Sequence, residues 1–319
     1  MGRHRPVKVV IIGGAGGIGS SAAFNLLSAQ GTYEIVLVDT RPHMITSHTM
    51  DLENALGLGT TADTVRGGTP EDALDADVVV LSAAVPLRLN SSRSVFLADN
   101  ARIVEECLRP VREAGADFGG VVLMLTNPVD PLLTWVHRQG WLPRERLIGY
   151  TLNDSLRLRT GIAFALGVPV KDVGAWMLGE HGEGQVPLYS RVTVGGERVA
   201  LTEAQRTVAE EYVDTWYAKH VALDSGRTST WTTGLGTARI IEALHTGSGT
   251  VVPASVVLDG EYGVYGASLT VPVELRPEGV RRIVTWDLPA EELAGMSQAA
   301  ANVEAAASEL TAHHATQLS

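Results

Sequence analysis

The sequence contains very little cysteine, because Cys107 is its only one in 319 residues. A single thiol cannot form an intrachain disulfide or a cysteine-rich zinc site, so packing has to stabilise the fold, and we predict no metal site. The scarcity of cysteine also agrees with a reducing compartment, and we expect a cytoplasmic protein.

Long hydrophobic runs are absent. The longest apolar stretches are interrupted by glycine, proline or charged residues, so no segment is predicted to cross a membrane. Near the start of the chain, the apolar run covers only residues 9–12 before glycines begin, which is too short for the core of a signal peptide. We interpret this run as a buried strand.

An excess of positive charge is absent too. Lys and Arg number 25 against 36 Asp and Glu, the formal net charge is -11, and no run of basic residues occurs. This balance argues against a non-specific nucleic-acid binder and against a protein that binds anionic membranes. It would also repel a small anionic ligand at long range, so any anion-binding site has to be built locally.

The rest of the composition is that of a globular protein. Hydrophobic residues make up 45% of the chain and charged residues 19%, which is too apolar for a disordered protein. The length suffices for one large domain or two moderate ones. No internal repeat or low-complexity linker divides the chain.

The first half of the chain alternates short β-rich runs with helical patterns. The β-rich runs are continuously apolar, which suits strands that are covered on both faces of a parallel sheet. They lie at residues 7–12, 34–39, 77–82, 121–125 and 146–150, and the helical patterns lie at residues 18–29, 43–56, 95–114 and 131–139. Repeated strand–helix units predict an α/β fold, namely a Rossmann-type doubly wound parallel sheet.

The pattern changes near residue 150. Beyond it, helices are predicted at residues 154–166, 202–223, 237–245 and 289–310, and β-rich runs at residues 173–177, 251–258, 263–273 and 281–286. We therefore predict two domains, residues 1–150 and residues 151–319, the second of α+β type.

A glycine-rich turn follows the first predicted strand and precedes a predicted helix. It satisfies both G-x-G-x-x-G and G-x-x-G-x-x-G, and its residues are Gly13, Gly14, Gly16, Gly17, Ile18 and Gly19. Such a turn lets the backbone approach a pyrophosphate closely and presents the N-terminus of the next helix to the phosphates. Because the strand and helix are both in place, we predict that the domain at residues 1–150 binds a dinucleotide.

Asp39 ends the second predicted strand, at the distance from Gly19 that is expected for a carboxylate on a ribose 2′-hydroxyl. It would repel a 2′-phosphate and so favours NAD over NADP. Nearby Arg41 keeps NADP open, and FAD fits the same residues, so the identity of the cofactor depends on the second half of the chain. The plainer interpretation of Asp39 is a turn residue at the end of a strand.

A second group of chemically capable residues begins near residue 150. His181 stands between glycines after a β-rich run, and its ordinary pKa near neutrality suits an acid or a base. Asp154 and Arg157 are three residues apart on a predicted helix and project to one side. Asp154 can stabilise an imidazolium at His181, and Arg157 can hold a carboxylate in a bidentate fork. Asn127 ends a strand, where ligands of open α/β sheets bind.

Each of these residues, taken alone, also fits a surface or packing role. The whole set makes that interpretation improbable. The remaining histidines carry no such pattern and are assigned to surface or packing, among them His43, His48, His137, His220 and His245.

Together these motifs resemble the lactate/malate dehydrogenase family, essentially from end to end. The pieces that carry the resemblance are residues 13–19, 50–52, 126–130 and 179–182, Arg93 with Asn100, and Asp154 with Arg157. The glycine turn looks more like malate dehydrogenases, whereas residues 179–182 look more like the lactate dehydrogenase branch. The resemblance implies NAD as the cofactor, a small anionic 2-hydroxy or 2-oxo acid as the substrate, and a homodimer or homotetramer.

The resemblance also implies roles for the catalytic residues. An L-2-hydroxy acid would be interconverted with its 2-oxo acid by hydride transfer, coupled to proton transfer through His181 with Asp154 as its partner. Arg157 would bind the C1 carboxylate. Arg93, on a loop expected to close over the substrate, would polarise the C2 oxygen.

Three further residues are placed around the ligands by the same resemblance. Asn127 would hydrogen-bond the C2 oxygen and the cofactor side, and Asn100 would belong to the cofactor site. Ser229 would lie near the wall of the substrate pocket.

One loop departs from the family pattern. Counting back from Arg93 without gaps, Leu87 occupies the position that contacts the substrate tail, where malate enzymes carry Arg and lactate enzymes carry Gln. A second carboxylate against Leu87 would cost on the order of several kcal/mol unless Arg88 compensates. Malate and oxaloacetate are the default substrates. The alternatives are an apolar-tailed acid that faces Leu87, or an acid with another anionic tail, such as a phosphonate, bound by residues 90–93.

Two other classes of function fit the sequence less well than a dehydrogenase of this family. A catalytically silent NAD-binding module would not need His181, Asp154, Arg157 and Arg93. A short-chain reductase would need a Tyr-x-x-x-Lys pair, and no tyrosine of the chain has a lysine four residues on. Both observations favour the dehydrogenase.

Overall fold

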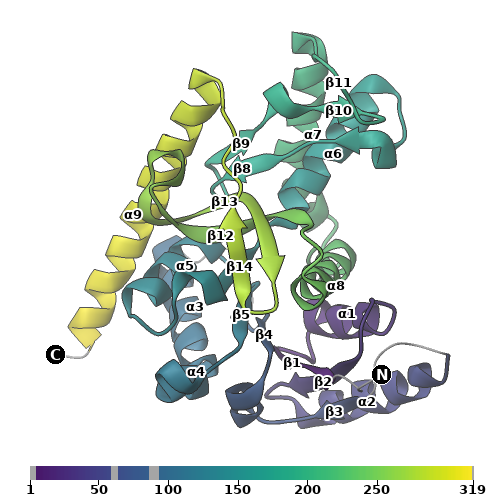
Figure 1. Cartoon of the computed structure of the whole chain (residues 1–319), viewed down its shortest axis with the longest axis vertical. Coiled ribbons are helices and arrows are strands. Elements are labelled where there is room, and N and C mark those ends of the chain that lie inside the picture. Colours follow the sequence, from purple (N-terminus) through teal and green to yellow (C-terminus); the bar gives the residue numbers. More distant parts are fainter. Residues whose placement is uncertain (1–4, 59–63, 86–92, 318–319) are drawn as a thin grey trace.

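The computed structural model describes residues 5–58, 64–85 and 93–317 of the chain. Its N-terminal half forms a parallel sheet (Figure 1). In sheet order the strands are β3 (Thr64–Gly67), β2 (Tyr33–Val38), β1 (Val7–Ile12), β4 (Val78–Leu81), β5 (Val121–Met124) and β6 (Leu147–Tyr150). The order 3-2-1-4-5-6 is that of a Rossmann-type doubly wound sheet, which confirms the predicted fold class.

The same sheet continues into the C-terminal half. Strand β12 (Val251–Asp259) pairs antiparallel with β6, with Ala254 opposite Tyr150 and Ser255 opposite Gly149. Beyond β12 follow β13 (Tyr265–Arg276), β8 (Met177–Gly179) and β9 (Gln185–Pro187), and β14 (Gly279–Ile283) pairs with β13. One sheet therefore runs through both halves of the chain.

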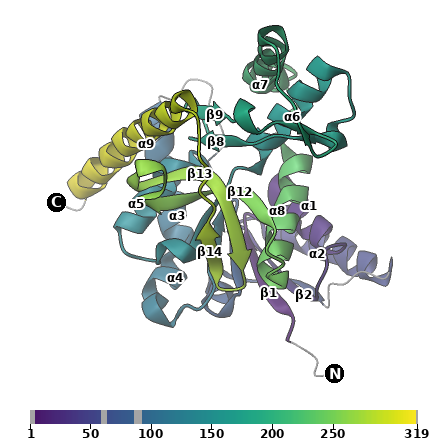
Figure 2. The same ribbon diagram turned by 45° about the horizontal axis from the view of Figure 1, so that its top comes forward.

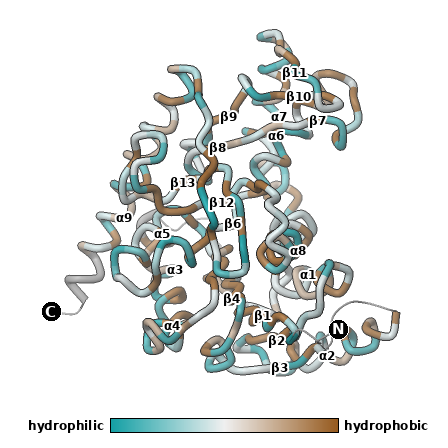
Figure 3. Tube along the Cα trace, viewed as in Figure 1, coloured by the Kyte–Doolittle hydropathy of each residue, from teal (hydrophilic) through white to brown (hydrophobic). Residues whose placement is uncertain are grey.

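Helices cover both faces of the sheet. On β1, Val9 and Ile11 belong to one buried cluster and Val10 and Ile12 to another, as the alternation of side chains along a strand requires. The first cluster includes residues of α1 (Gly17–Leu26), α2 (Pro42–Ala55) and α8 (Thr230–Thr246). The second includes residues of α3 (Arg93–Cys107), α4 (Arg109–Ala114) and α5 (Val129–Arg138). The hydropathy colouring in Figure 3 shows brown along the central strands, as this burial requires.

A smaller lobe stands beyond the carboxyl ends of the parallel strands (Figure 2). It is built from α6 (Leu152–Leu166), α7 (Glu203–Ala222) and a sheet of β7 (Val173–Gly174), β10 (Thr193–Val194) and β11 (Glu197–Arg198), with a buried cluster of its own. A Cβ on Gly161 of α6 would lie 2.8 Å from the Ala209 carbonyl oxygen of α7, so the two helices pack closely. The last helix, α9 (Ala290–Gln317), crosses the edge of the molecule.

Several sequence predictions of secondary structure were wrong in detail. Residues 95–114 are two helices, because Pro110 lacks the N–H that a continuous helix needs and lies in the first turn of α4. The helix predicted at residues 237–245 begins at Thr230, and the run at residues 173–177 is divided between β7 and β8 in two sheets. Strand β3 was not predicted. No helix in the described ranges is long and apolar enough to span a membrane.

The strand–helix junction at Gly19 gives a prediction about stability. A Cβ on Gly19 would lie 2.4 Å from the Gly13 carbonyl oxygen and 2.9 Å from Gly14 Cα, and both are backbone atoms. We expect Gly19→Ala to lower the free energy of unfolding by about 1–3 kcal/mol, because overpacking forces the backbone to shift. Urea unfolding measures this.

The matched control is Gly57→Ala, since a Cβ on Gly57 meets no atom within 4 Å. Its unfolding midpoint should stay close to that of the wild type. Equal midpoints for Gly19→Ala and the wild type would contradict the close packing described for this turn.

Candidate active site

The glycine turn brings backbone N–H groups to the carboxyl end of β1. Gly13 has a φ of +92°, and a Cβ there would lie 2.6 Å from the Ala83 backbone nitrogen, so only glycine fits. Gly16 is the N-cap of α1, and because it is glycine, no side chain of this residue covers the first turn of the helix. Close approach of backbone and an open helix N-terminus are what a pyrophosphate requires.

Asp39 lies directly beside this turn. Its Oδ2 accepts a hydrogen bond from the Ala15 N–H at 3.1 Å, which ties the end of β2 to the glycine turn. Its Oδ1 accepts from the Arg41 N–H at 3.1 Å and from Arg41 Nε at 3.0 Å. Burial raises the pKa of the Asp39 carboxyl, but the hydrogen bonds from Arg41 and Ala15 outweigh it and hold the pKa below its usual range. The carboxylate is therefore charged, which makes it a strong acceptor for hydroxyl groups.

His181, Asp154 and Arg157 come together in one contact chain. His181 Nδ1 contacts Asp154 Oδ2, and Arg157 Nη1 lies 3.4 Å from Asp154 Oδ1. Helix α6 carries Asp154 and Arg157 one turn apart, while His181 follows β8, so the contact joins two elements. The Asp154 side chain is only 2% exposed, whereas those of His181 and Arg157 keep about a fifth of their surface open. The buried carboxylate thus supports two accessible groups.

The protonation of His181 is set by the acids around it. Burial lowers the pKa of the imidazole, but the charge and hydrogen bond of Asp154 and the charge of Asp130 outweigh it, so the pKa lies above its usual 6.5. Arg157 opposes this rise. With Nδ1–H donating to Asp154, Nε2 is the ring nitrogen that can exchange a proton with a ligand.

Asp130 is a site residue that the sequence analysis did not single out. It lies in the first turn of α5, fully buried, and its Oδ2 accepts a hydrogen bond from the His181 N–H at 2.5 Å. Its Oδ1 accepts one from the Ser255 hydroxyl of β12. Burial raises the pKa of this carboxyl to about 7, against the lowering effect of Ser255 and His181. Only the motif at residues 126–130 could have pointed to it.

The residues around the loop after β4 are described in part. Asn127 is exposed at the end of β5, at the carboxyl edge of the sheet. Leu87 and Arg88 lie outside the described residues, and so does the side chain of Arg93, whose backbone begins α3.

The side chain of Asn100, which is predicted for the cofactor site, is enclosed by protein. It is fully buried, its Oδ1 accepts from the Val85 N–H at 3.0 Å, and its Nδ2 donates to the Phe96 carbonyl oxygen at 3.2 Å. The Oδ1 bond thus ties the segment after β4 to α3, whereas the Nδ2 bond stays within α3.

Ser229 is linked to the contact chain through Asn153, the neighbour of Asp154. Asn153 Nδ2 donates to Thr233 Oγ1 at 2.8 Å and to Ser229 Oγ at 3.3 Å, and Asn153 Oδ1 lies 2.8 Å from the Tyr150 hydroxyl. These bonds fasten the start of α8 to the start of α6. Ser229 therefore lies near the candidate site, half-buried at the N-terminus of α8.

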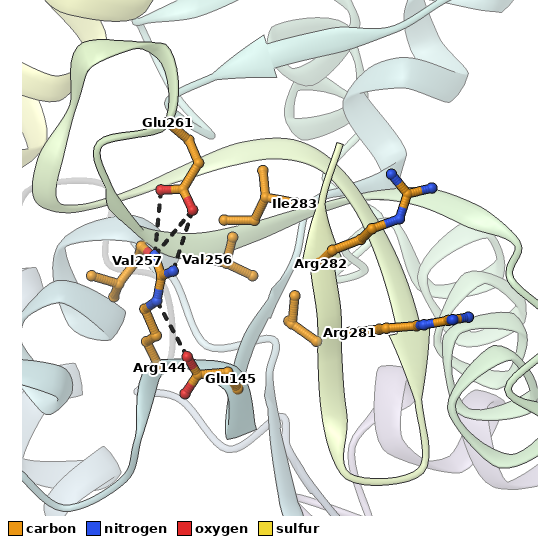
Figure 4. A pocket seen from close by; sticks show the side chains of 9 residues that line it. Arg144, Glu145, Val256, Val257, Glu261, Arg281, Arg282 and Ile283 are labelled. Atoms are coloured by element: carbon orange, nitrogen blue, oxygen red, sulfur yellow. Dashed lines mark hydrogen bonds and ion pairs between the residues drawn. The ribbon is translucent and has the colours of Figure 1, made fainter. Parts of the chain in front are cut away.

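The surface has two hollows of similar volume, and only one of them touches the predicted site residues. One, of about 300 Å³, lies between α1, α2 and α8 and shares Gly17 with the glycine turn. The other, of about 310 Å³, contains none of the predicted site residues (Figure 4). There Arg144 pairs with Glu261, while Arg281 and Arg282 point outward and pair with Glu274, so its charges are satisfied. Within the described ranges no cluster of three or more His, Cys, Asp or Glu side chains could hold a metal ion.

Comparisons with known proteins agree with this geometry. Residues 7–149 match the family model described as lactate/malate dehydrogenase, NAD binding domain, and residues 151–314 match the one described as lactate/malate dehydrogenase, alpha/beta C-terminal domain. The sequence is 33% identical to a malate dehydrogenase of Halobacterium salinarum, over 93% of this chain and 97% of that protein. It is 31% identical to an L-lactate dehydrogenase 2 of Bacillus cereus, over 90% of this chain and 93% of that protein.

The fold shows the same likeness. The minor L-lactate dehydrogenase of Enterococcus mundtii superposes with a TM-score of 0.86 at 29% identity, and the match covers 95% of this chain and 98% of that one. The resemblance that was drawn from the motifs is thereby confirmed.

The surroundings of His181 give a prediction about protonation. Its imidazole should titrate above 6.5, because Asp154 stabilises the charged form. Since the folded pKa is raised, this group contributes stability that is fully present below 6.5 and is lost as the pH rises through the folded value. We expect Asp154→Asn to lower the titration midpoint, because it removes the contacting charge that stabilises the imidazolium. NMR titration of the histidine ring signals measures it.

Asp287→Asn serves as the control, because Asp287 is an exposed acid that lies far in the sequence from His181 and Asp154. It should leave the His181 midpoint where it is. A midpoint that does not move in Asp154→Asn would rule out the role assigned to Asp154.

Proposed function

The chain belongs to the lactate/malate dehydrogenase family, and we propose that its site oxidises a small L-2-hydroxy acid to the 2-oxo acid with NAD and catalyses the reverse reduction. One observation carries the proposal. His181 contacts a buried Asp154, and Arg157 stands one helical turn from that carboxylate. An acid–base group and a carboxylate-binding group are thus held on one support.

The described residues fit NAD. The glycine turn leaves no room for a Cβ at Gly13 or Gly19, and α1 begins directly behind it. The charged Asp39 beside the turn suits ribose hydroxyls and would repel a 2′-phosphate. We propose that residues 13–19 and Asp39 hold the dinucleotide, with Asn127 beside it at the carboxyl edge of the sheet.

In the oxidation, His181 accepts the proton of the substrate hydroxyl at Nε2. The Nδ1–H bond to Asp154 fixes the tautomer that leaves Nε2 free, and Asp154 stabilises the imidazolium that forms. Arg157 pairs with the C1 carboxylate and so orients C2. NAD, when bound, supplies the acceptor for the hydride that leaves C2. In the reduction, His181 returns its proton to the developing alkoxide.

Arg93, Leu87 and Arg88 are proposed for the loop that meets the rest of the substrate. Arg93 would polarise the C2 oxygen, and Ser229 would stand near the pocket wall, where Asn153 ties it to α6. Malate and oxaloacetate are the proposed pair of substrates, supported by the glycine turn and the malate dehydrogenase relatives. Leu87 favours a second candidate, a 2-oxo acid without a second carboxylate.

The remaining proposals concern organisation and compartment. We place the dinucleotide-binding domain at residues 1–150 and the substrate domain at residues 151–319, and the two family models, which meet between residues 149 and 151, support this division.

A cytoplasmic location is supported by the single cysteine. Burial raises the pKa of the Cys107 thiol to about 12, so it stays a protonated, unreactive packing group.

Steady-state kinetics with NADH tests the proposed reaction. We expect oxaloacetate to give the highest kcat/KM in a panel with pyruvate, branched and aromatic 2-oxo acids and phosphonopyruvate, and His181→Asn to lose nearly all turnover while it still binds NADH. Turnover of no member would refute the reaction. A higher kcat/KM with pyruvate than with oxaloacetate would refute only the choice of substrate. A strong gain of oxaloacetate activity in Leu87→Arg would likewise show that the wild type is not specialised for oxaloacetate.

We propose in addition that the chain forms a homo-oligomer through the face made by α1, α2 and α8. Large apolar side chains are exposed there: Phe24 at 61%, Met50 at 62%, Trp231 at 69% and Leu235 at 50%. The hollow of about 300 Å³ between these helices is lined in part by Phe24 and Trp231. Exposed apolar patches of this kind mark interfaces between proteins.

Sedimentation measures the oligomeric state. We expect the wild type to sediment as a dimer or tetramer, and Phe24→Ser to weaken the assembly because it removes apolar surface from the proposed interface. Tyr265→Ser is the control, since Tyr265 is 72% exposed on β13, away from this face. A monomeric wild type, or equal effects of the two substitutions, would contradict the interface.

A further inference from the structure

Arg157, on which the proposed binding of the substrate carboxylate rests, is held by very few polar contacts. Within the described part of the chain its guanidinium donates one hydrogen bond, to Asp154, and that bond is long at 3.4 Å. A guanidinium has five N–H donors in a plane. The other donors are thus available to a ligand, but one long bond does not fix the orientation of the plane.

An aromatic ring supplies the missing constraint. Trp216 of α7 lies under the guanidinium, with Arg157 Cζ at 4.3 Å from the centre of the ring. A cation over the face of an indole is attracted by the negative face of the ring, and the contact uses none of the N–H donors. Trp216 can therefore hold the plane of Arg157 while its edge remains free to form a bidentate pair with a carboxylate.

Trp216 is itself held from its own helix. The ring of His220, one turn later, stacks on it with a centroid distance of 5.0 Å and an angle of 9° between the planes. His220 Nε2 lies 3.0 Å from the Arg227 carbonyl oxygen, in the segment that leads to α8. The stack is thus fastened to the start of α8, the same region that Asn153 binds through Ser229.

These contacts link three helices. Arg157 of α6 contacts Trp216 of α7, whose neighbour His220 contacts the segment before α8. Ser229, at the start of α8, is bonded back to α6 through Asn153. The half-buried Trp216 contributes little to a core, since Ala209 is the buried residue of α7 and packs on Gly161. The Trp216 ring instead contacts Arg157 and His220.

We propose that Trp216 is a positioning residue for the substrate carboxylate: its indole face orients the Arg157 guanidinium for bidentate pairing. This inference rests on the proposed function, because it takes Arg157 as the group that binds the carboxylate. Binding of a carboxylate changes the charge above the indole, so the emission of Trp216 reports that the site is occupied.

The test compares Trp216→Leu and Trp216→Phe with Trp286→Leu. Trp286 provides a matched control, because it stacks with Arg191 in the same way, with Cζ at 4.1 Å from the ring centre, outside the contact chain. Trp216→Leu should raise the KM for the best 2-oxo acid of the panel by roughly tenfold or more, while the KM for NADH changes little. Trp216→Phe keeps an aromatic face and should recover most of the loss, and Trp286→Leu should resemble the wild type.

Tryptophan emission gives a second, independent measurement. The best 2-oxo acid is titrated into the protein with NAD in its oxidised form, which carries no hydride to transfer. The emission should change in the wild type and in Trp286→Leu but not in Trp216→Phe.

Three outcomes overturn the proposal: an unchanged KM for the 2-oxo acid in a folded Trp216→Leu, an equal rise of the KM for NADH, or an emission change that persists in Trp216→Phe. If Trp216→Leu does not fold, Trp216→Phe and the emission measurement decide. Failure of the wild type to turn over any 2-oxo acid would refute the proposed function, and this inference with it, whereas a wild type that is active beside an unaffected Trp216→Leu refutes this inference alone.

Discussion

The contact between His181 and Asp154 is the interaction on which the rest of the site depends. An aspartate that is almost completely buried is costly unless its charge is paired, and Asp154 has two partners, His181 on one oxygen and Arg157 on the other. The pairing serves both sides. It stabilises the carboxylate, raises the pKa of the imidazole, and fixes a base and an anion-binding group with respect to one another.

A second acid, Asp130, fixes the backbone of His181. It accepts a hydrogen bond from the His181 N–H and another from the Ser255 hydroxyl of β12. His181 is thus fixed at its ring by α6 and at its backbone by α5, and both helices begin just after strands β5 and β6 of the parallel sheet. The carboxyl edge of the sheet therefore holds His181 as a rigid frame.

Much of this arrangement follows from the sequence, and the remainder has physical reasons for escaping it. The unalternated strands, the glycine turn and the i, i+3 spacing of Asp154 and Arg157 are local patterns, so they predict the parallel sheet, the site of the dinucleotide and one face of α6. Asp130 and Trp216 act across elements that are far apart in the sequence, and no local period reveals such a partner. The sequence analysis did not single out Trp216, and it assigned His220 to surface or packing, although the His220 ring stacks on Trp216 beneath Arg157. Strand β3 is as short as β4, β5 and β6, but only one of its four side chains is buried, so it lacks the continuous apolar run that marks those strands in the sequence.

The antiparallel pairing of β12 with β6 has a consequence for how the two halves relate. A chain that stopped at residue 150 would leave β6 as an open edge, with the unpaired backbone groups that invite aggregation, and Asp130 would lose the hydroxyl of Ser255. The C-terminal half therefore completes the folding of the N-terminal one as well as adding a pocket to it. Replacing either half with a foreign sequence would have to rebuild both the β6–β12 pairing and the hydrogen bond from Ser255 to Asp130.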